Sequence, residues 1–230
     1  MSIDILWPWE LENLSGKTAI VIDLWAATSN ISLLLGKGVK SLTLVNKENA
    51  IKAKDVYKNS ILVGEHYQLP ASFFDYSNYP SDVNRIMTTE HILYMTTNGS
   101  YVIEQAILKK AKNVIAGSLL NFDSIIQYLR RSKPEEIVFI PSGNRVRKNG
   151  KAGEDILCAE IFSRVFSGEK INWDKQIKIL KQIIVRDYGS EKGFNPEANF
   201  DIIFQLSKYN VIPICLKERW IEIKNLKNRF

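Results

Sequence analysis

Short hydrophobic runs alternate with amphipathic stretches along most of this chain. Such alternation is typical of βαβ units, and it predicts an α/β fold with largely parallel or mixed sheets in a layered α/β/α arrangement. The predicted strands cover residues 18–22, 42–45, 61–63, 92–95, 114–116 and 137–140. The predicted helices between and after them cover residues 31–35, 48–57, 102–111, 125–129 and 154–166.

The pattern changes beyond Gly168. Two helices and then a closing β-hairpin or pair of edge strands are predicted there, at residues 173–185, 200–209, 211–216 and 221–223. No linker rich in proline, glycine or serine divides the chain. We therefore expect residues 1–230 to form one α/β unit, in which lobes of about residues 1–145 and 146–230 would share one cleft.

One long stretch, residues 67–80, does not fit the alternation. It is rich in aromatic residues and proline, and it matches neither a helical nor a strand period. A long ordered loop inside a compact domain more often serves a function than merely connects two elements. We therefore expect this loop to have a functional role.

The composition is that of a globular protein, with 45% hydrophobic and 24% charged residues among 230. No hydrophobic run approaches the roughly 18 residues of a membrane span, and the start of the chain lacks the basic region of a secretory signal. Cys158 and Cys215 stand alone in apolar segments, which predicts buried free thiols. We expect a soluble protein of the cytoplasm with no membrane partner.

The net charge of +6 is carried by lysines and arginines that are spread along the chain. Their one dense cluster, residues 145–151, includes Arg145, Arg147 and Lys148. The spread favours a solvated basic surface over nucleic-acid binding. The cluster would attract an anionic small molecule.

Polar and acidic residues follow nearly every predicted strand. Because ligands of parallel α/β sheets bind outside the carboxyl ends of the strands, these residues predict one site. The turn Thr-Thr-Asn-Gly-Ser at residues 96–100 suits an anion, since its glycine permits a close backbone approach and a helix N-terminus presents free N–H groups. Acids at other strand ends suit Mg²⁺, which takes few protein carboxylates beside its waters and a substrate phosphate. The residues at these ends are Asp23, Thr28, Ser29, Glu65, Thr96, Thr97, Asn98, Gly99, Gly117, Ser118, Asn121, Ser142, Gly143, Glu154 and Asp155.

Each of these features has a purely structural alternative. Serine, threonine and asparagine are ordinary helix N-caps, and Asn-Gly and Ser-Gly are common turn dipeptides. Acids in a first helical turn interact favourably with the helix dipole. The convergence of several strand ends favours a site but names no reaction. The GxxxxGK[ST], GxGxxG and GxSxG motifs of familiar enzyme classes are absent.

Six motifs, taken in order, resemble those of the Mg²⁺-dependent 2-phosphosulfolactate phosphatases of coenzyme M biosynthesis, the ComB-like family. The family's VIDVLRATT-type, glycine-glutamate, FDLGNSP-type, TTNGT, GSFLN-type and EDxLCA motifs are matched by VIDLWAATS at 21–29, LVGE at 62–65, FDYSNYP at 74–80, TTNGS at 96–100, GSLLN at 117–121 and GEDILCA at 153–159. The resemblance continues into the closing segment and covers about residues 18–224.

The resemblance implies a hydrolase that releases phosphate from a small anionic phosphomonoester, most closely 2-phosphosulfolactate, with Mg²⁺ as cofactor. Such a reaction needs its developing charge neutralised and its attacking oxygen aligned. Under this resemblance Asp23, Glu65 and Asp155 are candidates for catalysis, and the same three with Glu154 for the metal. The candidates for holding phosphate or substrate are Thr28, Ser29, Thr97, Asn98, Gly99, Ser118, Asn121, Arg145 and Arg147. A carboxylate at the position of Asp23 is compatible with two mechanisms. Either Asp23 is the nucleophile, or the metal activates a water that attacks the phosphate.

The first motif departs from the family pattern, because Ala26 replaces the family's arginine and the bulky Trp25 precedes it. Arginine is suited to a bidentate grip on phosphate or sulfonate. Its loss leaves two hypotheses, an active phosphatase and a family member without catalysis that binds an anionic metabolite. Arg145 and Arg147 are candidates to supply the missing cation. The aromatic segment at residues 7–9 would pack against a partner subunit in a homo-oligomer or within its own chain.

Overall fold

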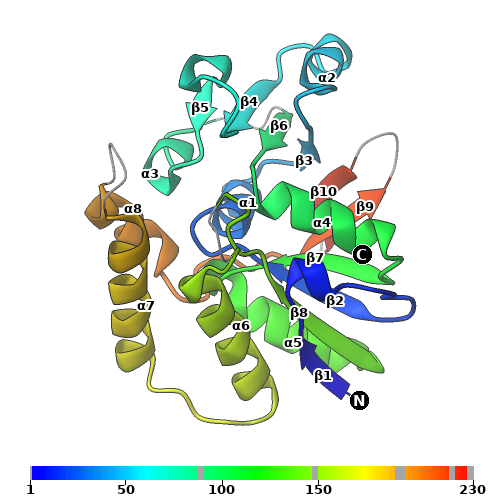
Figure 1. Ribbon diagram of the computed structural model, residues 1–230, viewed down its shortest axis with the longest axis vertical. Helices are drawn as coiled ribbons and strands as arrows, with labels where there is room; N and C mark the ends of the chain where they lie inside the picture. The colour runs from blue at the N-terminus through cyan, green and yellow to red at the C-terminus, as the bar shows by residue number, and fades with distance from the viewer. Residues whose placement is uncertain (1, 88–90, 147–149, 190–194, 218–220, 227–230) are drawn as a thin grey trace.

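The computed structural model describes residues 2–87, 91–146, 150–189, 195–217 and 221–226, and in them the strands form one ten-stranded sheet (Figure 1). Its order is β1-β8-β2-β7-β9-β10-β3-β6-β4-β5. The strands are β1 (Ser2–Ile5), β2 (Thr18–Ile22), β3 (Ser41–Leu44), β4 (Ile61–Gly64), β5 (Tyr76–Ser77), β6 (Ile92–Met95), β7 (Asn113–Gly117), β8 (Glu136–Pro141), β9 (Pro213–Lys217) and β10 (Ile221–Asn225).

The helices follow the strands at nearly every crossover, as the α/β pattern predicts. They are α1 (Ala27–Gly36), α2 (Ala50–Val56), α3 (Pro80–Val83), α4 (Gly99–Leu108), α5 (Phe122–Ser132), α6 (Gly153–Phe166), α7 (Trp173–Tyr188) and α8 (Pro196–Ile203). Three short 3₁₀ turns accompany them, namely η1 (Pro8–Glu10), η2 (Ala71–Phe73) and η3 (Leu119–Asn121). No described helix is both long enough and apolar enough to cross a membrane.

The sheet contains two parallel groups of strands that run in opposite directions. One group is β1, β8, β2 and β7, and the other is β3, β6, β4 and β5. The hairpin β9–β10 lies between them and pairs antiparallel with β7 on one side and β3 on the other. Since each strand of a sheet is rotated by about 20–25° relative to its neighbour, the groups are turned relative to each other (Figure 1). The carboxyl ends of β2 and β6 consequently meet, and Gly99 lies against Asp23.

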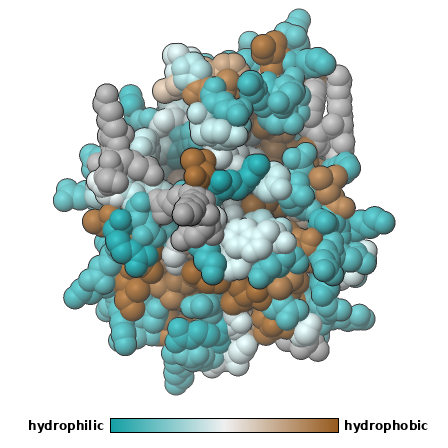
Figure 2. Space-filling view, in the orientation of Figure 1, coloured by the Kyte–Doolittle hydropathy of each residue, from teal (hydrophilic) through white to brown (hydrophobic). Residues whose placement is uncertain are grey.

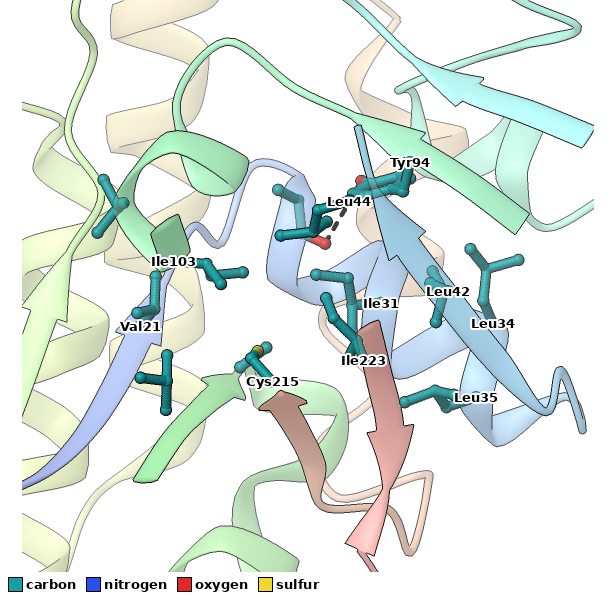
Figure 3. Close-up of a cluster of buried hydrophobic side chains, with 14 of the residues drawn as sticks. Val21, Ile31, Leu34, Leu35, Leu42, Leu44, Tyr94, Ile103, Cys215 and Ile223 are labelled. Carbon is teal, nitrogen blue, oxygen red and sulfur yellow. Dashed lines mark hydrogen bonds between the residues drawn. The ribbon is translucent and has the colours of Figure 1, made fainter. Parts of the chain in front are cut away.

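Alternate side chains of one strand enter different cores, as the period of two along a strand requires. Ala19 and Val21 of β2 pack in the core that contains α1 and α4. Ile20 and Ile22 pack in the core that contains α5, α6 and α7. The first core runs along both groups of strands, and Figure 3 shows side chains of α1 and α4 meeting those of β2, β3, β6, β9 and β10. Both faces of β2 are therefore covered, which explains its uninterrupted hydrophobic sequence.

The six strands predicted before residue 145 are all present, each within one residue of its expected bounds. Of the two alternatives predicted for the C-terminus, the β-hairpin is confirmed as β9–β10, and the pair of edge strands is wrong because this hairpin lies in the middle of the sheet. The helix predicted over 200–209 is wrong beyond Ile203, where α8 ends. There Ser207 has a φ of 54°, and the chain turns to donate the Ser207 and Tyr209 N–H groups to the carbonyls of η3. The predicted division into two lobes stays a prediction.

Both cysteines, Cys158 and Cys215, are buried and unpaired, as predicted. Figure 2 shows one face of the molecule, on which hydrophilic residues predominate and hydrophobic ones gather mainly in a band below the centre. The aliphatic side chains of the strands are largely buried. Burial of each such side chain stabilises the fold by about 1.5–3 kcal/mol.

The N-terminal tryptophans pack within their own chain. Trp7 stacks on Trp9 with ring centroids 5.1 Å apart. A Cβ added to Gly143 would lie 3.4 Å from the Trp7 ring, and one added to Gly150 would lie 3.1 Å from the Trp9 ring. The Asn144 N–H donates to the Gly150 carbonyl at 2.8 Å. The indoles therefore cover the loop that follows β8, while Trp9 keeps 56% of its surface exposed.

Candidate functional site

Asp23 follows the last residue of β2 and is only 6% exposed. Its Oδ1 accepts the N–H of Ala27 at 3.0 Å. Thr28 fixes the backbone of Asp23, since its Oγ1 accepts the Asp23 N–H at 3.0 Å and donates to the Asp23 carbonyl at 2.9 Å. Ser29 Oγ donates to the Leu24 carbonyl at 2.9 Å. The predicted substrate contacts Thr28 and Ser29 therefore hold the turn that carries Asp23.

Gly99 begins α4 and lies directly against Asp23. A Cβ at this position would be 2.8 Å from Asp23 Oδ2 and 2.6 Å from Ala27 Cβ, so only glycine allows this approach. The Gly99 N–H is one of the donors that lower the pKa of Asp23. The end of β6 and the end of β2 thus contribute to the same site, although the two strands belong to oppositely directed groups.

Glu65 follows β4 and holds the turn after β6. Its Oε1 accepts the Thr97 N–H at 2.8 Å, and its Oε2 accepts the Thr97 hydroxyl at 2.7 Å. Arg145 approaches the same turn, since its Nη1 donates to the Thr97 carbonyl at 3.3 Å and its backbone N–H donates to Asn98 Oδ1 at 3.0 Å. The Arg145 guanidinium lies 3.7 Å above the ring of Tyr101. Glu65, Thr97, Asn98 and Arg145 are therefore brought together as predicted.

Asp155 and Glu154 lie in the first turn of α6 and are 2% and 1% exposed. Asp155 Oδ1 accepts the Leu24 N–H at 2.8 Å, and its Oδ2 accepts the Gly143 N–H at 3.1 Å. Asp155 thus joins the strand ends of β2 and β8 from a helix 131 residues along the chain. Glu154 Oε1 accepts the Tyr188 hydroxyl at 2.6 Å, whereas its Oε2 has no hydrogen-bond partner among the described residues.

Burial disfavours the charged form of three carboxyl groups at this place. It raises the pKa of Asp23 to about 6, with a further contribution from the Glu65 charge. It raises the pKa of Glu154 to about 7, against the hydrogen bond from Tyr188. Burial and the charges of Glu154 and Asp23 raise the pKa of Asp155 well above its ordinary value. Such perturbed carboxyl groups in a cleft are common at functional sites.

Ser142 follows β8 at the level of Asp23, and its backbone N–H donates to the Ile22 carbonyl at 2.7 Å. Its side chain lies near enough to Asp23 to lower the pKa of that carboxyl. The buried Ser142 Oγ nevertheless lacks a well-formed hydrogen bond within the described residues. Within that part of the chain, no three histidine, cysteine, aspartate or glutamate side chains gather into a metal-binding group.

Ser118 and Asn121 are not joined to the acids by any hydrogen bond of the described residues. They form a capping box around η3, in which Asn121 Oδ1 accepts the Ser118 N–H at 2.9 Å. Ser118 Oγ donates to Ser32 Oγ at 3.0 Å, and both predicted residues are fully buried. Their predicted contact with substrate stays a prediction, as does that of Arg147, which lies outside the described residues.

A cavity of about 500 Å³ opens beside this cluster. Ala26, Glu65, Thr97 and Asn98 are among the residues that line it. The rest of its lining comes from the turn after β2, the end of β4, the irregular stretch of residues 66–79, the loop after β8 and the end of α7. These residues are Trp25, Gly64, His66, Tyr67, Leu69, Ala71, Phe74, Ser77, Asn78, Tyr79, Asn144, Val146 and Tyr188. The irregular stretch therefore borders the candidate site.

A second cavity, of about 270 Å³, shares Thr97 and His66 with the first. Arg145 and Lys217 line it. The described lining of the larger cavity contains neither Arg145 nor any other arginine or lysine. Arg145 is thus placed next to the site but does not line the cavity beside Ala26.

Three residues of the site were not predicted to have a functional role. Ser142 and Gly143 were expected only to lie at a strand end, and Tyr188 was not singled out. Tyr188 is the last residue of α7 and reaches Glu154 across 34 positions of the chain. No local pattern marks it, because its partner comes from another helix. Ser142 and Gly143 could have been found from the sequence, because the tripeptide Pro-Ser-Gly directly follows the predicted strand at residues 137–140.

The chain matches the model of the family described as 2-phosphosulpholactate phosphatase over residues 7–223. It is 35% identical over 218 residues to a probable 2-phosphosulfolactate phosphatase of Clostridium tetani, covering 92% of this chain and 90% of the relative. It is 29% identical to the probable enzyme of the same name from Clostridium perfringens strain 13, covering 92% and 86%. The corresponding protein of Thermoplasma volcanium is 29% identical over 162 residues, covering 70% and 72%. A match over nearly the whole chain shows that this protein belongs to the 2-phosphosulfolactate phosphatase family.

Proposed function

We propose that the protein is a Mg²⁺-dependent phosphatase that hydrolyses a small anionic phosphomonoester, 2-phosphosulfolactate or a related phosphorylated acid. The observation that carries this proposal is the buried carboxyl cluster of Asp23, Glu154 and Asp155, which lies at converging strand ends beside a cavity. Membership of the family and the names of the relatives support the reaction class. Turnover of 2-phosphosulfolactate would assign the protein to coenzyme M biosynthesis, and we expect it to act in the cytoplasm.

In this reaction the ester P–O bond breaks, an alcohol leaves with a proton, and water supplies the fourth oxygen of the released phosphate. Burial raises the pKa of Asp23 to about 6, so this side chain is a carboxylate at neutral pH, the form that would bind a cation. Burial raises the pKa of Asp155 well above its ordinary value, and its two oxygens accept the N–H groups of Leu24 and Gly143. We assign to Asp155 the orientation of the strand ends of β2 and β8 around Asp23.

The phosphate would lie at the N-terminus of α4. The first N–H group of this ten-residue helix, that of Gly99, donates to Asp23, and Asn98 and Thr97 line the adjoining cavity. Helix N-termini attract phosphate through unpaired N–H groups and the positive end of the helix dipole. Glu65 would act indirectly, because both of its oxygens already accept hydrogen bonds from Thr97.

The donor set fits a magnesium ion better than a closed metal centre. Mg²⁺ is commonly bound by one or two carboxylates together with water and substrate phosphate, so a cluster of three protein ligands is not required. Glu154 Oε2 is buried and has no hydrogen-bond partner in the described part of the chain, and the Asp23 charge acts on Glu154. Asp23 and Glu154 would hold the ion, whereas both oxygens of Asp155 already accept backbone hydrogen bonds. When bound, Mg²⁺ supplies positive charge to the phosphoryl oxygens.

The test is phosphate release from a panel of phosphorylated small acids, with Mg²⁺ and with a chelator. We expect Mg²⁺-dependent release that falls by about 10³-fold in Asp23→Asn, since this substitution keeps the shape of the side chain but removes its negative charge. Asp123→Asn, on the exposed first turn of α5, is the matched control. Release that is unaffected by Asp23→Asn or by chelation would contradict the proposal.

A second candidate function is binding of an anionic metabolite without catalysis. The observation that favours it is Ala26, which lines the cavity where the family pattern has arginine. Calorimetry distinguishes the two, because this alternative predicts tight binding of a phosphorylated acid with no phosphate release under any metal condition.

A further inference from the structure

Asn78 belongs to the irregular stretch after β4 and is one of the residues that line the larger cavity. Its Oδ1 accepts the Tyr94 hydroxyl at 2.6 Å and the Asn30 Nδ2 at 3.0 Å. The Asn30 Nδ2 also donates to the backbone carbonyl of Asn78 at 2.8 Å. A hydroxyl and an amide therefore hold both the side chain and the backbone of Asn78.

These two partners are polar groups inside the core. Tyr94 of β6, labelled in Figure 3, and Asn30 of α1 are fully buried. Burial of a hydroxyl or an amide costs free energy unless the group is hydrogen-bonded. Asn30 bears part of this cost, because its Oδ1 has no hydrogen-bond partner in the described part of the chain. An apolar pair of the same size would avoid the cost but could not fix Asn78.

The contacts also determine which end of the Asn78 amide faces the core. If the amide were turned over, its Nδ2 would lie 3.0 Å from the Asn30 Nδ2, and two donors would face each other. The Nδ2 is therefore the end that points away from Asn30. It has no acceptor among the described residues and is not one of their fully buried unpartnered atoms. Because Asn78 lines the cavity, a ligand there can accept this N–H donor.

The same contacts connect Asn78 to the acid cluster. The Tyr94 hydroxyl lies 3.4 Å from the Ala27 carbonyl, and the Ala27 N–H donates to Asp23 Oδ1 at 3.0 Å. Burial raises the pKa of Tyr94 well above its ordinary value, and the charges of Asp23 and Glu65 raise it further. The hydroxyl that holds Asn78 is thus close to both acids.

The chain on either side of Asn78 is held as well. Ser77 Oγ donates to Asp82 Oδ2 at 2.6 Å, and it accepts the Tyr79 N–H at 3.2 Å. A donor whose backbone and side chain are both fixed before a ligand arrives loses little conformational entropy when the ligand binds. The amide of Asn78 is therefore preorganised for binding.

On these grounds we propose that Asn78 is a substrate-binding residue, whose Nδ2 donates a hydrogen bond to an anionic oxygen of the phosphorylated acid. Tyr94 and Asn30 are its positioning residues. The inference rests on the proposed phosphatase function and adds a contact at the same site. A hydrogen bond to a charged group is worth about 10- to 100-fold in affinity.

Two substitutions of Asn78 test the contact. Asn78→Ala removes the donor without adding charge and should raise KM for 2-phosphosulfolactate about tenfold, with a much smaller change in kcat. Asn78→Asp keeps the acceptor for Tyr94 and Asn30 but replaces the donor with an anionic oxygen, so KM should rise about 100-fold. Asn84→Asp makes the same charge change at the exposed end of α3 and should leave KM unchanged. Natural KM values for both Asn78 variants would overturn the inference.

A double-mutant cycle tests the positioning role of Tyr94. Tyr94→Phe should raise KM severalfold in the natural protein and have no further effect in Asn78→Ala, because the hydroxyl then has no side chain to position. Tyr128→Phe, on α5 and outside both cavities, is the matched control. Thermal unfolding checks that each variant is folded, and Asn78→Ser replaces Asn78→Ala if the latter is not. Additive effects of the two substitutions would overturn the positioning role.

Calorimetry with the two products identifies the accepting oxygen. Weaker binding of inorganic phosphate by Asn78→Ala would place the contact on the phosphate, and weaker binding of sulfolactate would place it on an acid group of the organic part. Unchanged binding of both, at an unchanged KM, would overturn the inference and leave the phosphatase function standing. If the natural protein released no phosphate while Asn78→Ala bound 2-phosphosulfolactate more weakly, the phosphatase function would be contradicted and the contact would stand.

Discussion

Two turns in this molecule have nearly the same local chemistry and different surroundings. Residues 96–100 and residues 117–121 each follow a buried parallel strand, begin a helix or 3₁₀ turn, and contain serine, asparagine and glycine. The first turn contacts Asp23 and Glu65 and lines a cavity. The second is covered by the chain after α8, because the N–H groups of Ser207 and Tyr209 donate to the carbonyls of Leu119 and Leu120.

The difference lies in the partners of the polar groups. In the second turn, Ser118 and Asn121 form hydrogen bonds with each other and with neighbouring groups in the core, so these polar groups already have partners within the fold. In the first, Thr97 bonds to a carboxylate from another strand, and Gly99 leaves room for Asp23. A strand-end motif becomes part of a site only where tertiary structure leaves one side of it open and brings acids to the other.

The largest effect that separates the two turns should come from their glycines. Gly99→Ala places a methyl group 2.8 Å from Asp23 Oδ2, so we expect phosphatase activity to fall by about 10³-fold. Gly117→Ala places a methyl group 2.7 Å from Ile20 Cγ2 in the core and should cost about 1–3 kcal/mol of the free energy of unfolding. Steady-state kinetics and urea unfolding of both variants measure this. Similar kcat values for the two folded variants would contradict the distinction.

The pH dependence of stability should be the next largest effect. It concerns only the turn at residues 96–100, which we call the open turn, and the acids around it. The pKa of Asp23 is raised from 3.8 to about 6 in the folded protein, so the folded state binds this proton more tightly than the unfolded chain. Without metal, the resulting stabilisation is complete below about pH 4 and is lost as the pH rises through 6, which for this group amounts to about 3 kcal/mol.

Thermal unfolding in a chelator at pH 5 and pH 8 measures this loss. Asp23→Asn should flatten the dependence, and Mg²⁺ should restore stability at pH 8 because it binds the deprotonated form. Ser118→Ala, in the turn at residues 117–121, which we call the closed turn, should leave the dependence of stability on pH unchanged. A chelated natural protein that gains stability between pH 5 and pH 8 would contradict the sign.

Replacing one of the two acceptor oxygens of Glu65 tests whether the hydrogen bonds from Thr97 hold the open turn to the end of β4. In Glu65→Gln one carboxylate oxygen becomes an NH₂ group, which cannot accept from Thr97. We expect kcat/KM to fall by about 10²-fold through displacement of residues 97–99. Glu104→Gln, on α4 but outside the larger cavity, is the matched control. Equal kinetics of the two variants would show that Glu65 does not position this turn.

The smallest effect is expected in the closed turn. Ser118→Ala removes the hydroxyl that bonds to Ser32 and to Asn121, and it should lower the free energy of unfolding by about 1–2 kcal/mol. Because this turn does not line the described cavity, KM for the phosphorylated substrate should stay unchanged. Urea unfolding and steady-state kinetics check both parts. A raised KM at unchanged stability would instead support a direct contact of Ser118 with substrate.

Local patterns were sufficient for most of the fold. The six strands that were predicted before residue 145 are short, largely buried and separated by glycine, proline or polar residues, so their bounds could be predicted closely. The β9–β10 hairpin could be predicted as a pair but not placed at the centre of the sheet, since strand order depends on contacts between distant residues. The end of α8 at Ile203 escaped prediction because Ser207 and Tyr209 find their partners in η3.

The candidate site was predictable as a set of residues but not as a geometry. Asp23, Glu65, Gly99 and Asp155 lie at recognisable strand or helix ends, and the structure brings them together. Tyr188 could not be found, since nothing in the sequence links it to Glu154.

The sequence by itself determined the elements, the family and the acids at the strand ends, because hydrophobic period and short motifs are local properties of a chain. Only the tertiary structure decided which strand ends form the site. The central hairpin reverses the direction of half the sheet, and the accumulated twist brings the end of β6 to the end of β2. Burial then raises the pKa values of the acids, and the segment after α8 covers the one turn while leaving the other open. These are properties of packing between residues that lie far apart in the chain.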